Sequence, residues 1–145
     1  MTDPAIQLYF DVTIDDEHDL GLFMSCEGLG CEVVVEPREE GGNNLFVHQL
    51  PVRLKYTNIK LTRPLDEDSG LVARWFASMG GVLQRVSACI TALSTDQKAI
   101  AHWHLFDAFP VRWQGPSFNV DSAKVATETL ELAHHGFVYE KAPVR

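Results

Sequence analysis

Histidines occur in two short segments whose spacing could chelate a metal ion. His102 and His104 lie two residues apart in "AHWHLFDAFPVRW", and His134 and His135 are adjacent in "ELAHHGF". Residues two apart on a strand share a face, whereas adjacent residues point to opposite faces. At most one histidine of the second pair could therefore join the first, and the sequence supplies no orienting partner for a tetrahedral site. We expect no metal site and assign the histidines to half-buried or subunit-interface positions.

Three cysteines, Cys26, Cys31 and Cys89, are the other candidate ligands. Cys26 and Cys31 enclose a short turn, but no second Cys or His pair matches them, so the pattern of a zinc site is incomplete. An odd number of cysteines in a chain without a visible secretory signal favours free thiols in a reducing compartment. We expect neither a metal nor a disulfide here.

Several glutamates invite comparison with the paired carboxylates of glycosidases. They fall on predicted loop tips or solvent-facing positions, where carboxylates are normally solvated: Glu36, Glu39, Glu40, Glu128 and Glu131. The chain has no G-x-S-x-G motif, no Walker loop and no dinucleotide-binding glycine pattern. We therefore assign no catalytic residue and no cofactor, and expect a protein that is not an enzyme.

The composition narrows the class of protein. The chain has 145 residues, 46% of them hydrophobic and 22% charged, as expected for one globular domain over residues 1–145. Its net charge of −8 argues against a general nucleic-acid binder, which needs clustered Lys and Arg. We see no secretory signal, and no run of roughly 18–20 apolar residues that would span a membrane.

Alternating apolar and polar residues predict strands over most of the chain. "IQLYFDVTID" alternates with Val12 and Ile14 on the apolar face. "FMSCEGLGCEVVVEP" is expected to bend near Gly28 and Gly30, and "REEGGNN" to form the loop of a long hairpin. In the return strand an apolar set alternates with a polar set, and the alternation slips, or is kept by a bulge, past Asn58. The two sets are Val52, Leu54 and Tyr56, and Arg53, Lys55 and Thr57.

One segment, "LDEDSGLVARWFASMGG", has helical spacing and predicts a short helix over about residues 69–79. Its apolar stripe is formed by Leu71, Val72, Trp75, Phe76 and Met79. Asp68 or Ser69 is expected to cap the helix, and Gly80 and Gly81 to end it.

The remaining segments again read as strands. "QRVSACITALSTDQKAIAHWHLFDAFPVRW" predicts a hairpin that turns at "STDQ", and a long alternating strand follows a polar connection near the C-terminus. The fold class expected is mainly β: two packed antiparallel sheets, as a sandwich or barrel, with one short flanking helix. The hairpins hold more strand than a domain of this size needs, and isolated two-stranded arms are unstable in water. We therefore expect the chain to pair its arms with copies of itself in a ring, tube or filament.

The sequence resembles the tail-tube proteins of contractile phages, and more closely the inner-tube proteins of bacterial phage-like contractile injection systems. The similarity runs from about Phe10 to Phe137 and keeps the family's order of blocks. These blocks are "EGGNNLFVHQLPVRLKYTNIKLTRPL", "LVARWF" and "FDAFPVRWQGPSFNVDSAKVATETLELAHHGF". One departure is His135, where the resemblance leads us to expect an acidic residue, as in "LAHEGF".

The resemblance implies hexameric rings that stack into a tube. Two long hairpins of each subunit, over about residues 32–60 and 109–137, would join a continuous β-barrel around a lumen. The implied partners are other copies of the chain, a surrounding sheath protein, baseplate and tube-cap proteins, and luminal protein cargo. Specific nucleic-acid binding would arise only in a phage tail, and no membrane anchor is implied. The chain would be cytoplasmic and assembled into a phage-like particle.

The same resemblance assigns two sets of residues to the assembly. Contacts with neighbouring subunits and rings would involve Asp15, Asp16, Glu17, His18, Asp19, Pro37, Arg38, Glu39, Glu40, Gly41, Gly42, Asn43, Asn44, Pro116, Ser117, Phe118 and Asn119. The lumen would be lined by Arg53, Lys55, Lys124, Thr127, Thr129 and Glu131. From the net charge alone, an acidic lumen that repels nucleic acid is a further hypothesis.

Other functions stay open at this point. A baseplate protein that initiates the tube shares the fold, although typical initiators carry extra segments. The tube protein of type VI secretion shares the architecture but not these motifs. From other classes come a small-ligand β-barrel carrier, with tryptophans lining its cavity, and a metal hydrolase that uses the histidines. The sequence does not distinguish a phage from an injection system.

Overall fold

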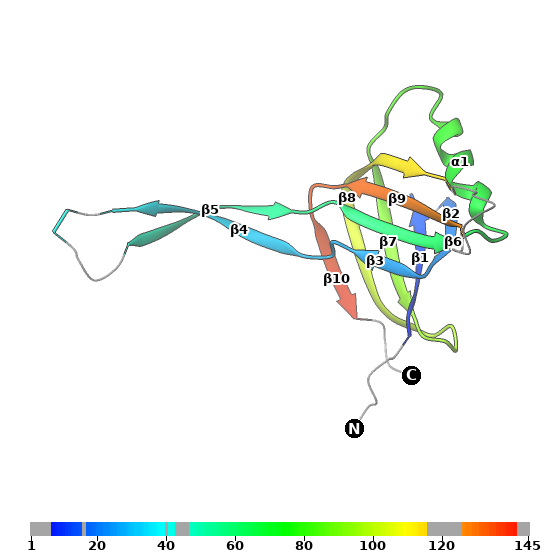
Figure 1. The fold of residues 1–145 in the computed structure, drawn as a ribbon, viewed down its shortest axis with the longest axis horizontal. Helices are drawn as coiled ribbons and strands as arrows, with labels where there is room; N and C mark the ends of the chain where they lie inside the picture. The colour runs from blue at the N-terminus through cyan, green and yellow to red at the C-terminus, as the bar shows by residue number, and fades with distance from the viewer. Residues whose placement is uncertain (1–6, 16, 40, 43–46, 116–125, 142–145) are drawn as a thin grey trace.

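A computed structural model describes residues 7–15, 17–39, 41–42, 47–115 and 126–141 of the chain. These residues form a mainly β structure with one helix (Figure 1). The elements are β1 Tyr9–Ile14, β2 His18–Phe23, β3 Ser25–Glu27, β4 Cys31–Arg38, β5 His48–Tyr56, β6 Ile59–Pro64, α1 Ser69–Ser78, β7 Val86–Leu93, β8 Ala99–Gln114, β9 Thr127–Ala133 and β10 Phe137–Lys141. The prediction of a mainly β fold with antiparallel sheets and one short helix is confirmed. No helix among the described residues is long and apolar enough to cross a membrane.

Two layers of the sandwich share the long strand β8. The strand order is β2-β1-β7-β8-β9-β6-β3, and β10 also pairs with β8. β7 pairs with β8 as far as Ala108, and β9 pairs with the rest of β8 from Phe109. Phe106 and Asp107 lie opposite the single residue Ser87 where the register with β7 shifts, and Asp107 adopts a left-handed backbone with φ 51°. This bulge directs β8 from one layer into the other.

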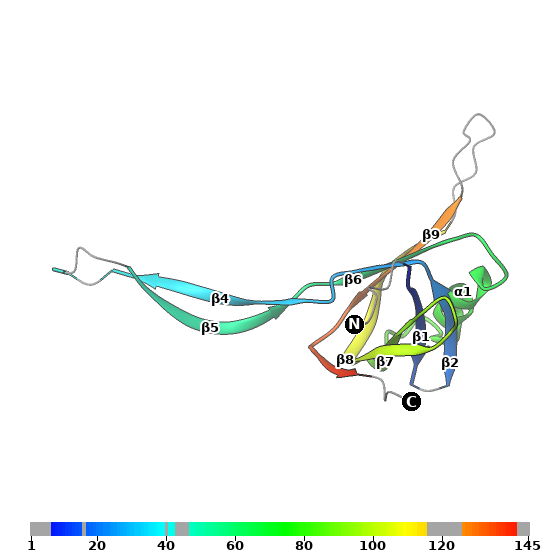
Figure 2. The same ribbon diagram turned by 90° about the horizontal axis from the view of Figure 1, so that it is seen from below.

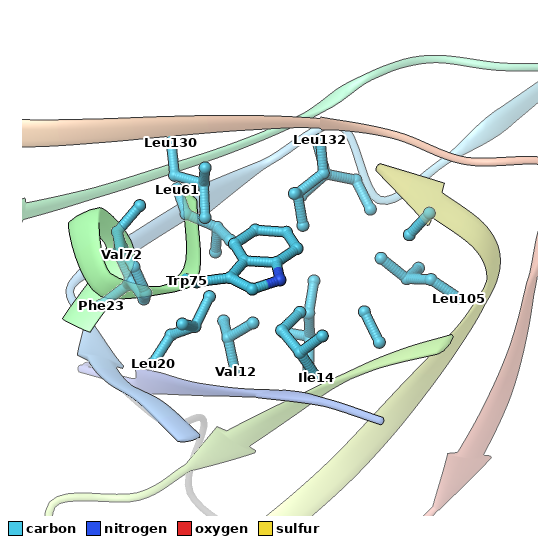
Figure 3. Close-up of a cluster of buried hydrophobic side chains, with 14 residues drawn as sticks. Val12, Ile14, Leu20, Phe23, Leu61, Val72, Trp75, Leu105, Leu130 and Leu132 are labelled. Carbon is cyan, nitrogen blue, oxygen red and sulfur yellow. The ribbon is translucent and has the colours of Figure 1, made fainter. Parts of the chain in front are cut away.

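The hydrophobic core lies between the two layers. Strands of both layers and the helix contribute the buried side chains, among them Val12, Ile14, Ile59, Leu61, Val72, Trp75, Ile90, Leu105, Leu130 and Leu132. Figure 3 shows the indole of Trp75 in the middle of this cluster. The core positions alternate along each strand, so the predicted faces of β1 are confirmed, with Val12 and Ile14 fully buried.

Helix α1 closes the core and falls within the predicted range. Val72 and Trp75 are buried, and Phe76 and Met79 pack against the core, as the apolar stripe predicts. The predicted side-chain cap is wrong, because Asp68 occupies the N-cap position without making a capping hydrogen bond. Its carboxylate lies beside Gly21 of β2 instead, where a Cβ would meet it at 2.7 Å.

An ion pair inside the core joins β6 to β9. Arg63 and Glu128 are both 0% exposed, and Arg63 Nε donates to Glu128 Oε2 at 2.9 Å. The other guanidinium nitrogens donate to the carbonyl oxygens of Leu20 (2.6 Å) and Asp68 (2.7 Å). Trp113 Nε1 donates to Glu128 Oε1 at 2.7 Å. One buried pair therefore ties together β2, β6, β8, β9 and the start of α1.

The expectation that Glu128 faces solvent is wrong. Glu128 occupies the same face of β9 as the core residues Leu130 and Leu132, and its cross-strand neighbour is Arg63. The carboxylate can be buried there because Arg63 and Trp113 donate to both of its oxygens.

The hairpin segments are divided differently from the expectation. Within residues 32–60, the paired strands β4 and β5 end at Tyr56, and Ile59 begins β6, which pairs with β9 and β3. The predicted slip near Asn58 is thus a break between two strands, and the bulge in this hairpin lies earlier, where the β4–β5 register shifts between Val34 and Val35. Within residues 109–137, β8 pairs with β9, while β10 begins at Phe137 and returns to the first half of β8. The predicted turn at "STDQ" is confirmed by the Ser94 N–H donating to Lys98 O.

Candidate assembly interface

The β4–β5 hairpin forms an arm that stands clear of the body (Figures 1 and 2). In the described part of the chain, β4 and β5 form a separate two-stranded sheet and pair only with each other. Such a pair is marginally stable in water unless one of its faces is covered. The arm is therefore the part of the molecule that most needs a partner.

One face of the arm is apolar and exposed. Val33 and Leu54 are cross-strand partners, and side chains alternate from face to face along each strand, so Val35 and Tyr56 share their face. Val33 is 50% exposed, Leu54 55% and Val35 46%. Side chains of this type normally lie in a core, and an exposed apolar face of this kind is typical of a binding surface.

The opposite face of the arm is charged. Glu32 pairs with Lys55 across the strands, and Arg53 pairs with Val34. The expected lumen residues Arg53 and Lys55 thus share one exposed face, away from Val33 and Leu54. The arm is amphipathic across its two faces, as the alternation in its return strand predicts.

The arm joins the body at a compact joint. Thr57 Oγ1 donates to Gly28 O at 3.1 Å, and His134 Nε2 donates to Thr57 O at 3.0 Å. The Gly136 N–H donates to His134 Nδ1 at 3.1 Å, so both ring nitrogens of this buried histidine are bonded. The ring of Tyr56 lies 5.5 Å from that of His134.

Gly28 allows the close approach of two segments at this joint. It has φ 96°, and a Cβ there would overlap the carbonyl oxygen of Asn58. Both observations require glycine. The predicted bend near Gly28 therefore has a specific purpose, which is to let the start of the arm lie against its return.

The histidines do not form one cluster. His102 and His104 share a face of β8 with their rings 6.1 Å apart, but His102 hydrogen-bonds Thr91 and His104 Nε2 donates to Glu140. His134 belongs to the arm joint, and His135 is exposed. In the described ranges no group of three or more His, Cys, Asp or Glu side chains could hold a metal ion.

His135 contacts two charged residues next to the β8 bulge. Its Nε2 lies 2.9 Å from Arg85 Nη1, and its Nδ1 lies 3.5 Å from Asp107 Oδ2. The resemblance suggests an acidic residue at this position. Such a residue would form an ion pair with Arg85, but the negative charge of Asp107 would repel it. Histidine is compatible with both neighbours.

The expected ring-contact residues fall into separate regions. Asp15, Glu17, His18 and Asp19 are exposed at and after the β1–β2 turn, and Asp15 Oδ1 accepts the N–H of Ser87 at 2.8 Å. Pro37 and Arg38 end β4, and Glu39, Gly41 and Gly42 follow toward the arm tip. The structure does not bring the turn and the tip together, because the arm carries its tip away from the body. The remaining members lie outside the described residues: Asp16, Glu40, Asn43, Asn44, Pro116, Ser117, Phe118 and Asn119.

Three carboxyl groups, from β1, β2 and the N-cap of α1, meet in one place. Asp11, Asp19 and Asp68 line one surface hollow with Gly21 and Leu71. Burial raises the pKa of Asp11 from 3.8 to about 7, and the neighbouring Asp19 and Asp68 add to this effect. Asp11 was not singled out from the sequence, because on an alternating strand it reads as an ordinary polar-face residue.

The expected lumen residues of β9 lie on one face. Thr127, Thr129 and Glu131 alternate with the buried Glu128, Leu130 and Leu132. Glu131 lies opposite Lys60 of β6 and Arg112 of β8. Lys124 lies outside the described residues.

The tryptophans support a filled core more than a ligand cavity. Trp75 is 3% exposed within the core (Figure 3). Trp113 stacks near Phe76 with ring centroids 6.2 Å apart, and Trp103 lies 5.5 Å from the ring of Tyr139. Each indole packs against other side chains, which does not favour a small-ligand carrier.

Comparisons with known proteins agree with this architecture. Residues 6–138 match the family model described as T4-like virus tail tube protein gp19. No curated protein sequence matches the chain significantly.

Solved structures share the fold. The chain is similar to a chain in the baseplate of the anti-feeding prophage, at 23% identity and a TM-score of 0.77, covering 97% of this chain and 98% of that one. A chain in the extended sheath-tube complex of the PVC extracellular contractile injection system gives 21% identity and a TM-score of 0.74, covering 97% and 93%. Hcp1 from Salmonella typhimurium is more distant, at 15% identity and a TM-score of 0.53, covering 92% and 93%.

The family match spans nearly the whole chain, both sandwich layers and the arm. The chain belongs to the family of T4-like virus tail tube protein gp19, and it is a structural tail-tube protein of contractile particles.

Proposed function

We propose that the chain is the inner-tube subunit of a contractile injection system or phage-like tail. Hexameric rings of the chain would stack into a tube whose lumen passes cargo and whose shaft punctures an envelope. The observation that carries this proposal is the arm, a paired hairpin with an exposed apolar face and no covering element in the described chain.

The strand order supports closure into a ring. Over residues 109–114, β8 pairs with β9 along one edge. Along the other edge of β8, the pairing with β7 ends at Ala108, so no described strand pairs with that edge beyond it. Strands β4 and β5 likewise pair only with each other among the described strands. The arm of one copy therefore adds one of its free edges to the β8 edge of the next copy, so each copy donates one edge and receives another. Repetition around a ring removes both edges.

The outward face of β6 and β9 and the charged face of the arm then line the lumen. This assignment includes Arg53, Lys55, Thr127, Thr129 and Glu131, together with Lys124 in the connection between β8 and β9. Hydroxyl and paired charged groups suit a wet channel, because none of them needs to be desolvated.

Contacts between stacked rings are assigned to the exposed turn and the two hairpin tips. The turn supplies Asp15, Asp16, Glu17, His18 and Asp19. The tip of the arm supplies Pro37, Arg38, Glu39, Glu40, Gly41, Gly42, Asn43 and Asn44, and the second connection supplies Pro116, Ser117, Phe118 and Asn119. Loops at opposite ends of the subunits would meet as the rings stack.

The particle would be assembled in the cytoplasm from several proteins. Similar chains occur in structures of a baseplate, a tube-terminating cap and a sheath-tube complex, so the same classes of protein are the proposed partners. The chain's role in the particle would be mechanical, without catalysis or a cofactor.

Electron microscopy tests the proposal. The purified chain, and particles from cells that also express sheath and baseplate proteins, are expected to show stacked six-fold rings. Val33→Glu with Leu54→Glu is expected to abolish rings and leave a folded monomer, because only the exposed face of the arm changes. Lys55→Ser, on the other face, is the matched control. A strictly monomeric protein under all these conditions would refute the proposal.

A tube-initiating baseplate subunit is the second candidate. The similar chain in the anti-feeding prophage baseplate is covered over 98% of its length, so the same fold also occurs in that part of a particle. Imaging of a tagged chain in whole particles separates the candidates. Labels along the shaft support the tube subunit, and a single labelled layer at the baseplate supports the initiator.

A further inference from the structure

The loop between α1 and β7, residues 80–85, lies where the edge of β8 becomes unpaired. β7 covers that edge up to the pair Val86–Ala108, and the chain that enters β7 comes from this loop. Over the next residues of β8, the only described strand that pairs with it is β9, on the opposite edge. The loop therefore flanks the edge that would receive an arm.

Side-chain contacts hold the helix before this loop, and the end of the loop, against the second half of β8. In α1, which leads into the loop, the ring of Phe76 lies 6.2 Å from that of Trp113. At the end of the loop, the guanidinium of Arg85 lies 5.7 Å from the ring centre of Phe109. Trp113 is on the core side of β8, because its indole bonds the buried Glu128. Helix α1, from which the chain enters the loop, therefore lies on the core side of the layer.

Val82 and Leu83 project from this loop into solvent. They are 63% and 69% exposed, more than any other large hydrophobic residue in the described chain. Gly80 and Gly81 precede them with φ of 60° and 83°, a left-handed backbone that turns the chain outward after α1. Because both side chains are mostly exposed, they add little buried apolar surface to their own subunit and are available to a partner.

We propose that residues 80–85 form a ledge that covers the apolar face of the arm of a second copy. This inference rests on the proposed function, in which that arm adds to the β8 edge. When the arm adds to the free edge of β8, it extends the layer beyond β7 and α1. The face of the arm that points to the core side of the layer then lies next to the ledge. The charged face of the arm then continues the outward face of β9. The opposite face of the arm, which carries Val33 and Leu54, contacts Val82 and Leu83 of the first copy.

The ledge explains how an amphipathic arm is held on both sides. Backbone hydrogen bonds along β8 set the position of the arm but do not distinguish its two faces. Burial of apolar side chains against the ledge selects the orientation with the charged face outward, because the reverse would desolvate Arg53 and Lys55. The partner surface is thus specific for this arm in one orientation.

Cross-linking tests the contact directly. In a Cys31→Ser background, Leu83→Cys combined with Leu54→Cys and treated with a short bismaleimide is expected to give a ladder of covalent multimers. The arm points away from the body of its own chain, so such links form between copies (Figure 1). Cys26 is a quiet background thiol, because burial raises its pKa to about 12. The control replaces Leu54→Cys by Lys55→Cys, on the opposite face, and should give no ladder.

A second measurement uses assembly strength. Val82→Ser with Leu83→Ser should raise the concentration needed for assembly by about tenfold or more, since two apolar side chains lose their burial. The urea unfolding of the monomer should not change. Val138→Ser, at a residue 50% exposed on β10, is the control. If wild-type tubes form but the ladder is absent and the serine variants assemble normally, the ledge is overturned and the proposed function stands. If the wild type forms no multimer at all, both are overturned.

Discussion

At the scale of single residues, the buried pair of Arg63 and Glu128 makes the sharpest prediction. Glu128→Ala leaves the guanidinium of Arg63 buried without its counter-charge, and Trp113 Nε1 without its acceptor. Removing one partner of such a pair costs about 3–5 kcal/mol. We expect the free energy of unfolding, measured by urea denaturation, to fall by that amount.

The neighbouring Glu131 provides the matched control for this variant. It lies on the same strand but on the outward face, opposite Lys60 and Arg112. Glu131→Ala is expected to cost no more than about 1 kcal/mol, because partly exposed ion pairs contribute little. Equal losses for the two variants would contradict the assignment of Glu128 to the core.

Asp11 predicts a pH dependence of stability. Burial, assisted by Asp19 and Asp68, raises its pKa from 3.8 to about 7. The folded chain therefore binds this proton more tightly than the unfolded chain, so the contribution of Asp11 to stability is full below about pH 4 and is lost as the pH rises to about 7. Between about pH 5 and 8, the wild type should lose more unfolding free energy than Asp11→Asn, which cannot ionise. Exposed Glu17→Gln serves as the control, and parallel pH profiles for the wild type and Asp11→Asn would refute the prediction.

At the scale of elements, the joint of the arm depends on one glycine. Gly28→Ala places a Cβ against the carbonyl of Asn58 at a residue with φ 96°, so the two segments must separate. The expected loss is more than about 1 kcal/mol in urea unfolding. Gly30→Ala, only two residues away, has no atom within 4 Å of its new Cβ and should leave stability nearly unchanged. If the Gly28→Ala protein had the same free energy of unfolding as the wild type, the two segments of the joint could separate at no cost, contrary to this prediction.

Alternation along strands allowed most of the elements to be predicted, and it also contained a signal that was missed. In β9 the core face reads Glu128, Leu130, Leu132, and in β6 it reads Ile59, Leu61, Arg63. A carboxylate and a guanidinium at the inward positions of two strands suggest a buried pair once the strands are known to be neighbours. Their pairing, however, joins residues 65 positions apart in sequence, which local patterns do not reveal.

Other features could not be read from local patterns for the same reason. The bulge at Phe106 and Asp107 exists because β8 serves two layers, and no single strand pattern specifies that. The break between Tyr56 and Ile59 has the sequence pattern of a slip or a bulge, because apolar residues continue on both sides of it. The arm itself was predicted from its alternation and its glycine-rich tip, since both are local features.

At the scale of the whole molecule, the net charge of −8 can be compared with the charges on the face proposed for the lumen. The face proposed for the lumen pairs opposite charges across its strands: Glu27 with Lys60, Glu131 with Lys60 and Arg112, and Glu32 with Lys55. The excess of acid includes Asp11, Asp19 and Asp68, which gather away from this face. Among the described residues, the strands of the proposed lumen therefore supply little net charge, and the hypothesis of an acidic lumen rests on the net charge alone.

The exposed apolar face of the arm also predicts how the stability of the whole molecule depends on its concentration. If arms are buried only in assemblies, mass action raises the melting temperature as the protein concentration rises. Scanning calorimetry over a hundredfold range of concentration, with light scattering for particle size, should show this rise for the wild type. Val33→Ser with Leu54→Ser should melt at one temperature throughout, because the monomer leaves these side chains half exposed in any case. Lys55→Ser should behave as the wild type. A wild-type melting temperature that is constant while rings grow in number would mean that the arm contributes nothing to assembly.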